Sequence, residues 1–369
     1  MQKKSMEYSL IKSMVQIKMT KIGNKELKSF SSPYIIAEIG VNHEGSIDKA
    51  KELIFLAKKG GADAAKFQTY KAETIASINS PYYWDIKKES TKSQYALFKK
   101  YDVFNQEDYV ELSDYCKQVG IDFASTPFDE QAVDFLDPIM KYFKVASADI
   151  TNIPLLRKIA SKNKIVILST GASNKQEIDR AIEVLNKSGI TKDKIILLHC
   201  ILNYPTNNDN ANLLMIQDLI ETYEDHQIGY SDHTIPDEQM RPSVGSYLLG
   251  ATVIEKHFTN NKELPGNDHY HAMDVDDLKN LILNINKYSD LMGEKSKKPL
   301  ATEEISRLNA RRSIIVKRAK KTGDILQECD LICKRPGTGV PASEWDNIIG
   351  KKIKKNLNDD HILLWSDFE

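Results

Sequence analysis

The sequence predicts an α/β fold, a (β/α)8 TIM barrel followed by a small β-rich domain. Eight short apolar runs alternate with stretches of helical periodicity across about 265 residues, which matches the repeat of a closed barrel. After residue 294 the pattern changes to short β-like runs behind a polar segment. Polar and charged side chains gather where the apolar runs end, as at the carboxyl edge of such barrels. A doubly wound open sheet is the alternative topology.

The first strand–helix–strand unit sets the pattern. Residues 34–37 form a buried-strand run, and Ser46 is a suitable N-cap for a helix over residues 47–59. Gly60 and Gly61 end this helix, and residues 63–68 form the next strand. Later strands are expected at 122–125, 142–146, 165–168 and 195–198, and in the runs that end near residues 230 and 254. Later helices are expected at 106–119, 129–136, 153–162, 174–187, 211–223, 237–250 and 275–292.

We divide the chain into an N-terminal lead-in of residues 1–30, a barrel of residues 31–294, a linker of residues 295–310 and a second domain of residues 311–369. Within the barrel, residues 70–105 interrupt the alternation, and a stretch of this length is typical of a lid or a binding loop. In the second domain, residues 313–316, 330–333 and 362–365 are β-like, with turn chemistry at 336–339.

Composition excludes several classes of protein. The formal net charge of −1 gives no general attraction to nucleic acid or to an anionic membrane. No apolar run reaches the length of a membrane span, and the N-terminal residues lack the apolar region of a secretory signal. The four cysteines form neither a CxxC pair nor a dense framework, which indicates a reduced, cytoplasmic protein.

Two histidines follow successive strands and form a candidate metal pair. His233 ends one run and His257 ends the next, so parallel strands would bring both imidazoles to the same edge. Imidazole suits divalent first-row metals, and two protein ligands would leave positions for water or substrate oxygens. A single histidine at a strand end is more often structural. His199 is a possible third ligand, although we favour an orienting or structural role for it.

The other strand ends suggest an anion site. Lys66 and Lys144 supply charge, and short hydroxyl side chains recur beside them, which is how a protein without net positive charge can hold a phosphate. Glu38 is the candidate general acid or base, with a structural ion pair to Lys66 as the alternative. The remaining polar residues at these strand ends are Gln68, Thr126, Ser147, Asp149, Ser169, Tyr204 and Ser231.

These motifs together resemble the sialic acid synthase family. The matching segments are IAEIGVNHEGS at 36–46, KFQT at 66–69, STPF at 125–128, LSTG at 168–171, HC at 199–200, YPT at 204–206, GYSDHT at 229–234 and EKHF at 255–258. The C-terminal domain, with KRPGTG at 334–339, resembles the antifreeze-like (SAF) domain of that family. The resemblance runs from about residue 22 to the end of the chain.

The resemblance implies a domain-swapped homodimer that condenses phosphoenolpyruvate with an N-acetylated amino sugar and releases phosphate. It implies a divalent metal at His233 and His257, typically manganese, with magnesium or cobalt as alternatives. It assigns Glu38 as the catalytic carboxylate and places Asp268 and Gln68 at the sugar, with Arg335 reaching the N-acetyl group in the partner's site. It assigns phosphoenolpyruvate binding to Lys66, Thr126, Lys144, Ser147, Ser169, Tyr204 and Ser231.

The acceptor sugar stays open between several candidates. N-acetylmannosamine is the first expectation, and a diacetamido-deoxyhexose, the precursor of legionaminic or pseudaminic acid, is the alternative. The chain departs from the family at Leu202, where a small polar residue is common, and in the segment 236–242, which resembles a local insertion between the two histidines. A sugar-binding barrel that has lost its chemistry is the alternative from another class of protein. His43, His269 and His271 are further candidates for the sugar side.

Overall fold

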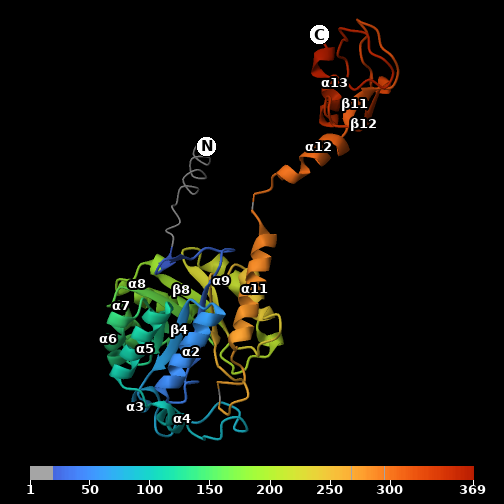
Figure 1. Ribbon diagram of the computed structural model, residues 1–369. Helices are drawn as coiled ribbons and strands as arrows, with labels where there is room; N and C mark the ends of the chain where they lie inside the picture. Colours follow the sequence, from blue (N-terminus) through green and yellow to red (C-terminus); the bar gives the residue numbers. More distant parts are fainter. Residues whose placement is uncertain (1–19, 267, 295) are drawn as a thin grey trace. The chain divides into compact units, whose positions relative to one another are not determined.

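The computed structural model describes residues 20–266, 268–294 and 296–369, and it separates into two compact units that divide after Gly293 (Figure 1). The first unit holds the predicted barrel. The second holds the β-rich domain together with η5 (Ala301–Glu303) and α12 (Glu304–Ala310), so part of the expected linker is helical. Within the described part of the chain, no helix is both long enough and apolar enough to cross a bilayer.

Eight parallel strands form the central sheet, and their hydrogen-bonded order is β5-β4-β3-β10-β9-β8-β7-β6. The two end strands, β5 and β6, also contact each other, so the sheet closes on itself and the predicted TIM barrel is confirmed. The strands are β3 (Tyr34–Gly40), β4 (Ala64–Thr69), β5 (Asp122–Pro127), β6 (Tyr142–Val145), β7 (Ile165–Ser169), β8 (Ile195–Cys200), β9 (Gln227–Asp232) and β10 (Val253–His257).

Helices surround the strands (Figure 1). Ser46 accepts a hydrogen bond from the Lys49 N–H at the start of the first of them, and Gly61 ends it with φ of 100°, as its sequence predicts. The barrel helices are α2 (Ile47–Gly60), α5 (Gln106–Val119), α6 (Glu130–Leu136), α7 (Ile153–Ala160), α8 (Lys175–Lys187), α9 (Leu214–Thr222), α10 (Arg241–Leu248) and α11 (Val275–Met292).

Alternate positions along each strand face opposite sides of the barrel wall. One set packs against the helices, as Ile254 and Phe143 do. The other set fills the barrel interior with apolar side chains such as Tyr34, Tyr142 and Val253. Further along the same strands the inward-facing positions become polar: Lys144 and Glu255 follow Tyr142 and Val253 by two residues, and Glu38 follows Tyr34 by four. The apolar interior of the barrel therefore ends near the carboxyl ends of the strands, where the polar residues predicted from the sequence lie.

Three predicted segments differ from the structure. Helix α10 begins at Arg241, not at residue 237, because Met240 has a positive φ of 52° and Pro242 occupies the first turn. The interruption at 70–105 contains two short helices, α3 (Ala72–Ile75) and α4 (Gln94–Tyr101). The β-like run at 362–365 makes only an isolated bridge through Ile362, and its end belongs to η8 (Trp365–Asp367).

Smaller elements complete the chain. The hairpin β1 (Lys21–Ile22) and β2 (Lys25–Glu26) lies in the lead-in, and β11 (Ser313–Val316) pairs antiparallel with β12 (Leu331–Lys334) in the second unit. That unit has its own apolar core, which includes Ile314, Val340 and Leu363, and it also contains α13 (Trp345–Ile348). The single-turn 3-10 helices of the barrel unit are η1 (Asp137–Ile139), η2 (Ser147–Asp149), η3 (Lys192–Lys194) and η4 (Asn208–Asn210), and those of the second unit include η6 (Glu328–Asp330) and η7 (Ala342–Glu344).

Candidate active site

A cavity of about 470 Å³ opens at the carboxyl ends of the barrel strands. Its lining contains the candidate catalytic, substrate-binding and metal residues of the barrel that the sequence indicates, but not His43, His199 or His271. The candidates in the lining are Glu38, Lys66, Gln68, Thr126, Lys144, Ser147, Asp149, Ser169, Tyr204, Ser231, His233, His257 and Asp268. Because these residues come from all eight strands or from the loops that follow them, closure of the barrel is what brings them together.

Two lysines and two carboxylates form a buried ionic cluster on the cavity floor. Lys66 Nζ lies 2.5 Å from Glu38 Oε2 and 3.5 Å from Glu255 Oε2, and Lys144 Nζ lies 3.3 Å from the other oxygen of Glu255. Thr126 accepts a hydrogen bond of 3.0 Å from Lys66, and Ser231 donates one of 2.9 Å to Glu255. The side chains of the four charged residues are at most 7% exposed, so each lysine is held within a network of charge and hydrogen bonds.

The two carboxylates differ in acidity. Burial raises the pKa of Glu38, Lys66 opposes this, and the neighbouring Glu255 adds to the rise. Burial also favours neutral Glu255, but Lys144 and Lys66 outweigh it and hold the Glu255 pKa at about 2. Burial disfavours the charged form of Lys66, yet both carboxylates raise its pKa overall. Glu255 is therefore a permanent anion, whereas Glu38 is the carboxyl group suited to exchange a proton.

Glu38 is held in position by two neighbours. Lys66 pairs with one of its oxygens, and the side-chain amide of Gln68 donates a hydrogen bond of 3.0 Å to the other. The ion pair between Glu38 and Lys66, which the sequence offered as a structural alternative to catalysis, is therefore present. It lies in the cavity lining, where it fixes the position of the Glu38 carboxyl group.

Hydroxyl groups occupy the side of the cavity near Lys144. Ser147 Oγ accepts the Gly171 N–H at 3.0 Å, and the buried Ser169 Oγ has no hydrogen-bond partner within the described residues. Asp149 is half-buried, and burial raises its pKa. An unpartnered hydroxyl in a cavity that is also lined by two buried lysines is suited to an anionic ligand.

His233 presents one ring nitrogen to the cavity. Its Nδ1 lies 2.8 Å from the Ile201 carbonyl oxygen, so Nδ1 carries a proton and Nε2 is the nitrogen available to a ligand. Burial lowers the pKa of His233, but the neighbouring Cys200 outweighs it and raises the pKa overall. The ring centroid lies 4.2 Å from that of Tyr204 and 5.6 Å from that of His257. The predicted pair is thus brought together at the cavity wall.

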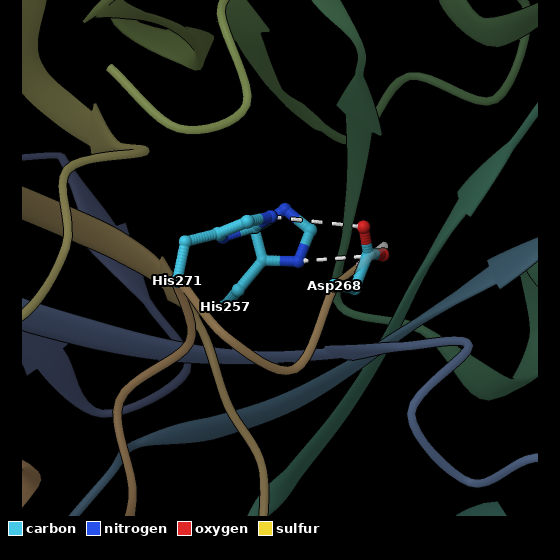
Figure 2. A group of neighbouring side chains, drawn as sticks. All are labelled: His257, Asp268 and His271. Carbon is cyan, nitrogen blue, oxygen red and sulfur yellow. Dashed lines mark ion pairs between the residues drawn. The ribbon is translucent and has the colours of Figure 1, made fainter. Parts of the chain in front are cut away.

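A second set of metal-type donors meets at the same place. His257, Asp268 and His271 each offer a donor atom, and these three atoms lie within 4.8 Å of one another (Figure 2). Burial lowers the pKa of both imidazoles, to well below its usual range for His257 and to about 3 for His271, and each charged ring would also repel its neighbours. Both rings are therefore neutral at pH 7, the form that binds a cation. These donors and the free nitrogen of His233 fit a divalent metal.

Glu255 is the residue that reasoning from the sequence did not place in this site, and His271, expected on the sugar side, lies beside His257. Glu255 precedes His257 by two positions on β10, and this period-2 spacing is a signal that could have indicated it. His271 follows the strand in a loop, where spacing gives no such signal.

The predicted residues His199 and Arg335 lie elsewhere, as does Asp232 of the GYSDHT motif. His199 places Nε2 2.8 Å from the Ala211 carbonyl and does not line the cavity. Asp232 faces the helices and forms a buried ion pair of 3.2 Å with Lys256. Arg335 is exposed and belongs to the second unit.

Aromatic and apolar side chains form the outer wall of the cavity. They come mainly from the segment 70–105, and Trp84, which donates its indole N–H to the Glu89 carbonyl at 3.0 Å, is buried among them. The members of this aromatic wall are Tyr70, Ile75, Tyr83, Trp84, Leu97, Phe98, Tyr101 and Phe128. The cavity therefore joins an ionic floor to an apolar entrance.

Comparison with known proteins places these features in a family. Residues 53–297 match the model of the NeuB family, and residues 311–369 match that of the SAF domain. The chain is 40% identical to N,N'-diacetyllegionaminic acid synthase of Legionella pneumophila over 94% of this chain and 98% of that protein. It is 31% identical to the N-acetylneuraminate-9-phosphate synthase of Homo sapiens over 90% of this chain and 91% of that protein. It resembles the crystal structure of an N-acetylneuraminic acid synthetase from Leptospira borgpetersenii with a TM-score of 0.69 and 31% identity, covering 78% of this chain and 95% of that one.

Proposed function

Because this chain belongs to the NeuB family, whose members include the sialic and legionaminic acid synthases, we propose that it condenses phosphoenolpyruvate with an N-acetylated amino sugar. The product is a 2-keto sugar acid, and phosphate is released. One observation carries this proposal: the buried cluster of Lys66, Lys144, Glu38 and Glu255 lies in one cavity with a set of metal-type donors.

The ionic floor would hold phosphoenolpyruvate. Lys66 and Lys144 contribute charge to its phosphate and carboxylate, and the unpartnered Ser169 hydroxyl contributes a donor. Thr126, Ser147, Tyr204 and Ser231 complete this wall of the cavity. Glu255 keeps both lysines in place before the ligand arrives, so the site is organised in advance.

The reaction joins two carbon atoms and releases phosphate. C3 of phosphoenolpyruvate forms a bond to the aldehyde carbon of the open-chain sugar, and the aldehyde oxygen becomes a hydroxyl group. Water adds to C2, and the C2–O bond to phosphate then breaks to leave a keto group. One proton of the water ends on the new hydroxyl and the other on phosphate. Glu38, with its raised pKa, is the group that would carry a proton between these oxygens.

A divalent metal, manganese by preference, would be held at His233 and His257. When bound, it would polarise the carbonyl group of the acceptor. The protein's part is to direct the free Nε2 of His233, whose tautomer the Ile201 carbonyl fixes, toward the cavity. The neutral ring of His257 lies opposite it.

The acceptor proposed here is a diacetamido-deoxyhexose, with N-acetylmannosamine as the second candidate. A deoxy sugar with two acetamido groups carries more methyl groups and fewer hydroxyls, and an apolar entrance that includes Tyr83, Trp84 and Phe98 favours it. The higher identity to a legionaminic acid synthase than to an N-acetylneuraminate-9-phosphate synthase supports the same choice. The homodimer and the contact of Arg335 with an N-acetyl group stay predictions.

Phosphate release is the test of this proposal. The full-length protein is incubated with phosphoenolpyruvate, manganese and either acceptor, and phosphate and the 2-keto acid are quantified together. The expected result is equimolar product with both acceptors, a higher kcat/KM for the diacetamido sugar, and loss of turnover with chelator. Equal turnover with and without chelator would exclude the metal, and binding of phosphoenolpyruvate without turnover of any acceptor would favour a sugar-binding protein.

A further inference from the structure

His271 and Asp268 lie beside His257, but no hydrogen bond between the three side chains accounts for their arrangement. Asp268 Oδ2 is 3.6 Å from His257 Nδ1, and Asp268 Oδ1 is 3.8 Å from His271 Nε2. Both separations exceed a hydrogen bond, although the carboxylate reaches toward the two rings (Figure 2). The three side chains approach each other without bonding directly.

The histidine nitrogens at this point lack partners. Neither ring nitrogen of His271 has a hydrogen bond within the described residues, and the same holds for Nδ1 of His257. The His271 side chain is 0% exposed and that of His257 is 8% exposed. Because a buried, unpartnered polar atom costs free energy, such a group calls for a ligand that the protein itself does not supply.

A metal ion accounts for the distances. Two donors that each lie about 2.1 Å from one ion are separated by roughly 3.0 Å at a right angle and by about 3.4 Å at the tetrahedral angle. The observed 3.6 and 3.8 Å exceed these separations by about 0.2–0.8 Å, and all three donor atoms lie within 4.8 Å of one another, whereas direct hydrogen bonds would be shorter. Small side-chain rotations would bring the three donors onto one ion.

We propose that Asp268 and His271 are protein ligands of the divalent metal, together with His257 and His233. This rests on the proposed function in one respect, that the cavity takes a divalent cation. Asp268 then acts mainly at the metal and not only at the sugar, and three imidazoles surround the ion. With a carboxylate and three imidazoles, the site binds the ion in the absence of any substrate.

The experiment measures manganese binding to the metal-stripped, full-length protein without substrates, by isothermal titration calorimetry. His271→Asn and Asp268→Asn are each expected to weaken manganese binding by at least about 10-fold. Loss of a side chain that only hydrogen-bonds a metal ligand already weakens metal binding by about 10- to 100-fold, so loss of a direct ligand should cost no less. His199→Gln is the matched control, because His199 is also a buried histidine at a neighbouring strand end, and its affinity for manganese should equal that of the wild type. Wild-type affinity in folded His271→Asn would overturn the inference.

A second measurement needs no variant. Electron-spin-echo spectroscopy of manganese bound to the wild-type protein counts coordinated imidazole nitrogens. Three such nitrogens support the inference, and two overturn it. If the count is two while turnover still requires the metal, the inference fails and the proposed function stands. If the metal binds through three imidazoles but no acceptor turns over, the inference stands and the proposed function fails.

Discussion

Replacement of Glu255 by glutamine tests the ionic floor directly. Among the described residues, Glu255 is the carboxylate that pairs with both lysines, and Lys144 donates one further hydrogen bond, of 3.4 Å, to the Val145 carbonyl. Glutamine keeps the shape of the side chain and removes its charge. The variant therefore removes the charge that pairs with Lys144 at 3.3 Å, and the Lys144 side chain is only 4% exposed.

The expected loss of stability is large. Removing one partner of a buried ion pair costs about 3–5 kcal/mol, and the shape-conserving amide favours the lower end of that range. For a domain of this size, 1 kcal/mol corresponds to about 2 °C in melting temperature, so Glu255→Gln should melt roughly 6–10 °C below the wild type. Phosphoenolpyruvate should stabilise the variant more than it stabilises the wild type, because the ligand replaces the missing negative charge.

Thermal unfolding with and without phosphoenolpyruvate measures both effects. Asp232→Asn is the matched control, because Asp232 forms an equally buried ion pair of 3.2 Å with Lys256 on the helix-facing side of the wall. This control should lose stability in a similar way, yet phosphoenolpyruvate should shift its melting temperature only as much as it shifts the wild type.

Two results would refute the reasoning. A wild-type melting temperature for Glu255→Gln would mean that the carboxylate does not hold the lysines. An equal ligand-induced shift in Glu255→Gln, Asp232→Asn and the wild type would mean that phosphoenolpyruvate does not occupy the ionic floor.

Three further predictions concern the acid, a buried histidine and the entrance. Glu38→Gln should lower kcat by about 100-fold or more. The Kd of phosphoenolpyruvate, measured by calorimetry, should stay within a few-fold of the wild-type value. An unchanged kcat would exclude proton transfer by Glu38. Burial lowers the pKa of His43 to about 4, and its Nδ1 accepts the Gly45 N–H at 3.0 Å, so the folded state resists protonation. Since the unfolded chain takes up this proton near pH 6.5, the free energy of unfolding falls as the pH drops from 6.5 toward 4. In urea unfolding, the wild type should lose about 2 kcal/mol more between pH 7 and pH 5 than His43→Gln does. Equal losses in the two proteins would contradict the lowered pKa of His43. Tyr83→Ala should raise the KM of the acceptor several-fold and leave the KM of phosphoenolpyruvate unchanged. The control Ile78→Ala, at a 73% exposed position of the same segment, should alter neither KM. Equal effects of the two substitutions on the KM of the acceptor would argue against a sugar contact by Tyr83.

The barrel could be predicted because its signal is repeated along the chain. Each apolar run has strand length and is followed by a helix with ordinary caps, as Ser46 and Gly61 illustrate. Element boundaries depend on single residues, and the start of α10 was set by the positive φ of Met240 next to Pro242. Periodicity alone carries no information about such a turn.

Residues at the ends of strands could be placed in the site, since parallel strands in a barrel share one edge. Their individual partners could not. Glu255 pairs with lysines from β4 and β6, and His271 meets His257 only because its loop folds back over the strand end. These contacts depend on closure of the barrel and on loop conformation, which are three-dimensional properties.

The balanced ionic floor has a consequence for how the site responds to solution conditions. Lys66 and Lys144 already have internal counterions in Glu38 and Glu255, so no mobile ions need to leave when an anion arrives. Ionic strength should therefore have little influence on the affinity for phosphoenolpyruvate. The added negative charge instead favours uptake of a proton by Glu38, and the measured binding enthalpy should depend on the ionisation enthalpy of the buffer. The site thus exchanges protons, not salt ions, with its surroundings.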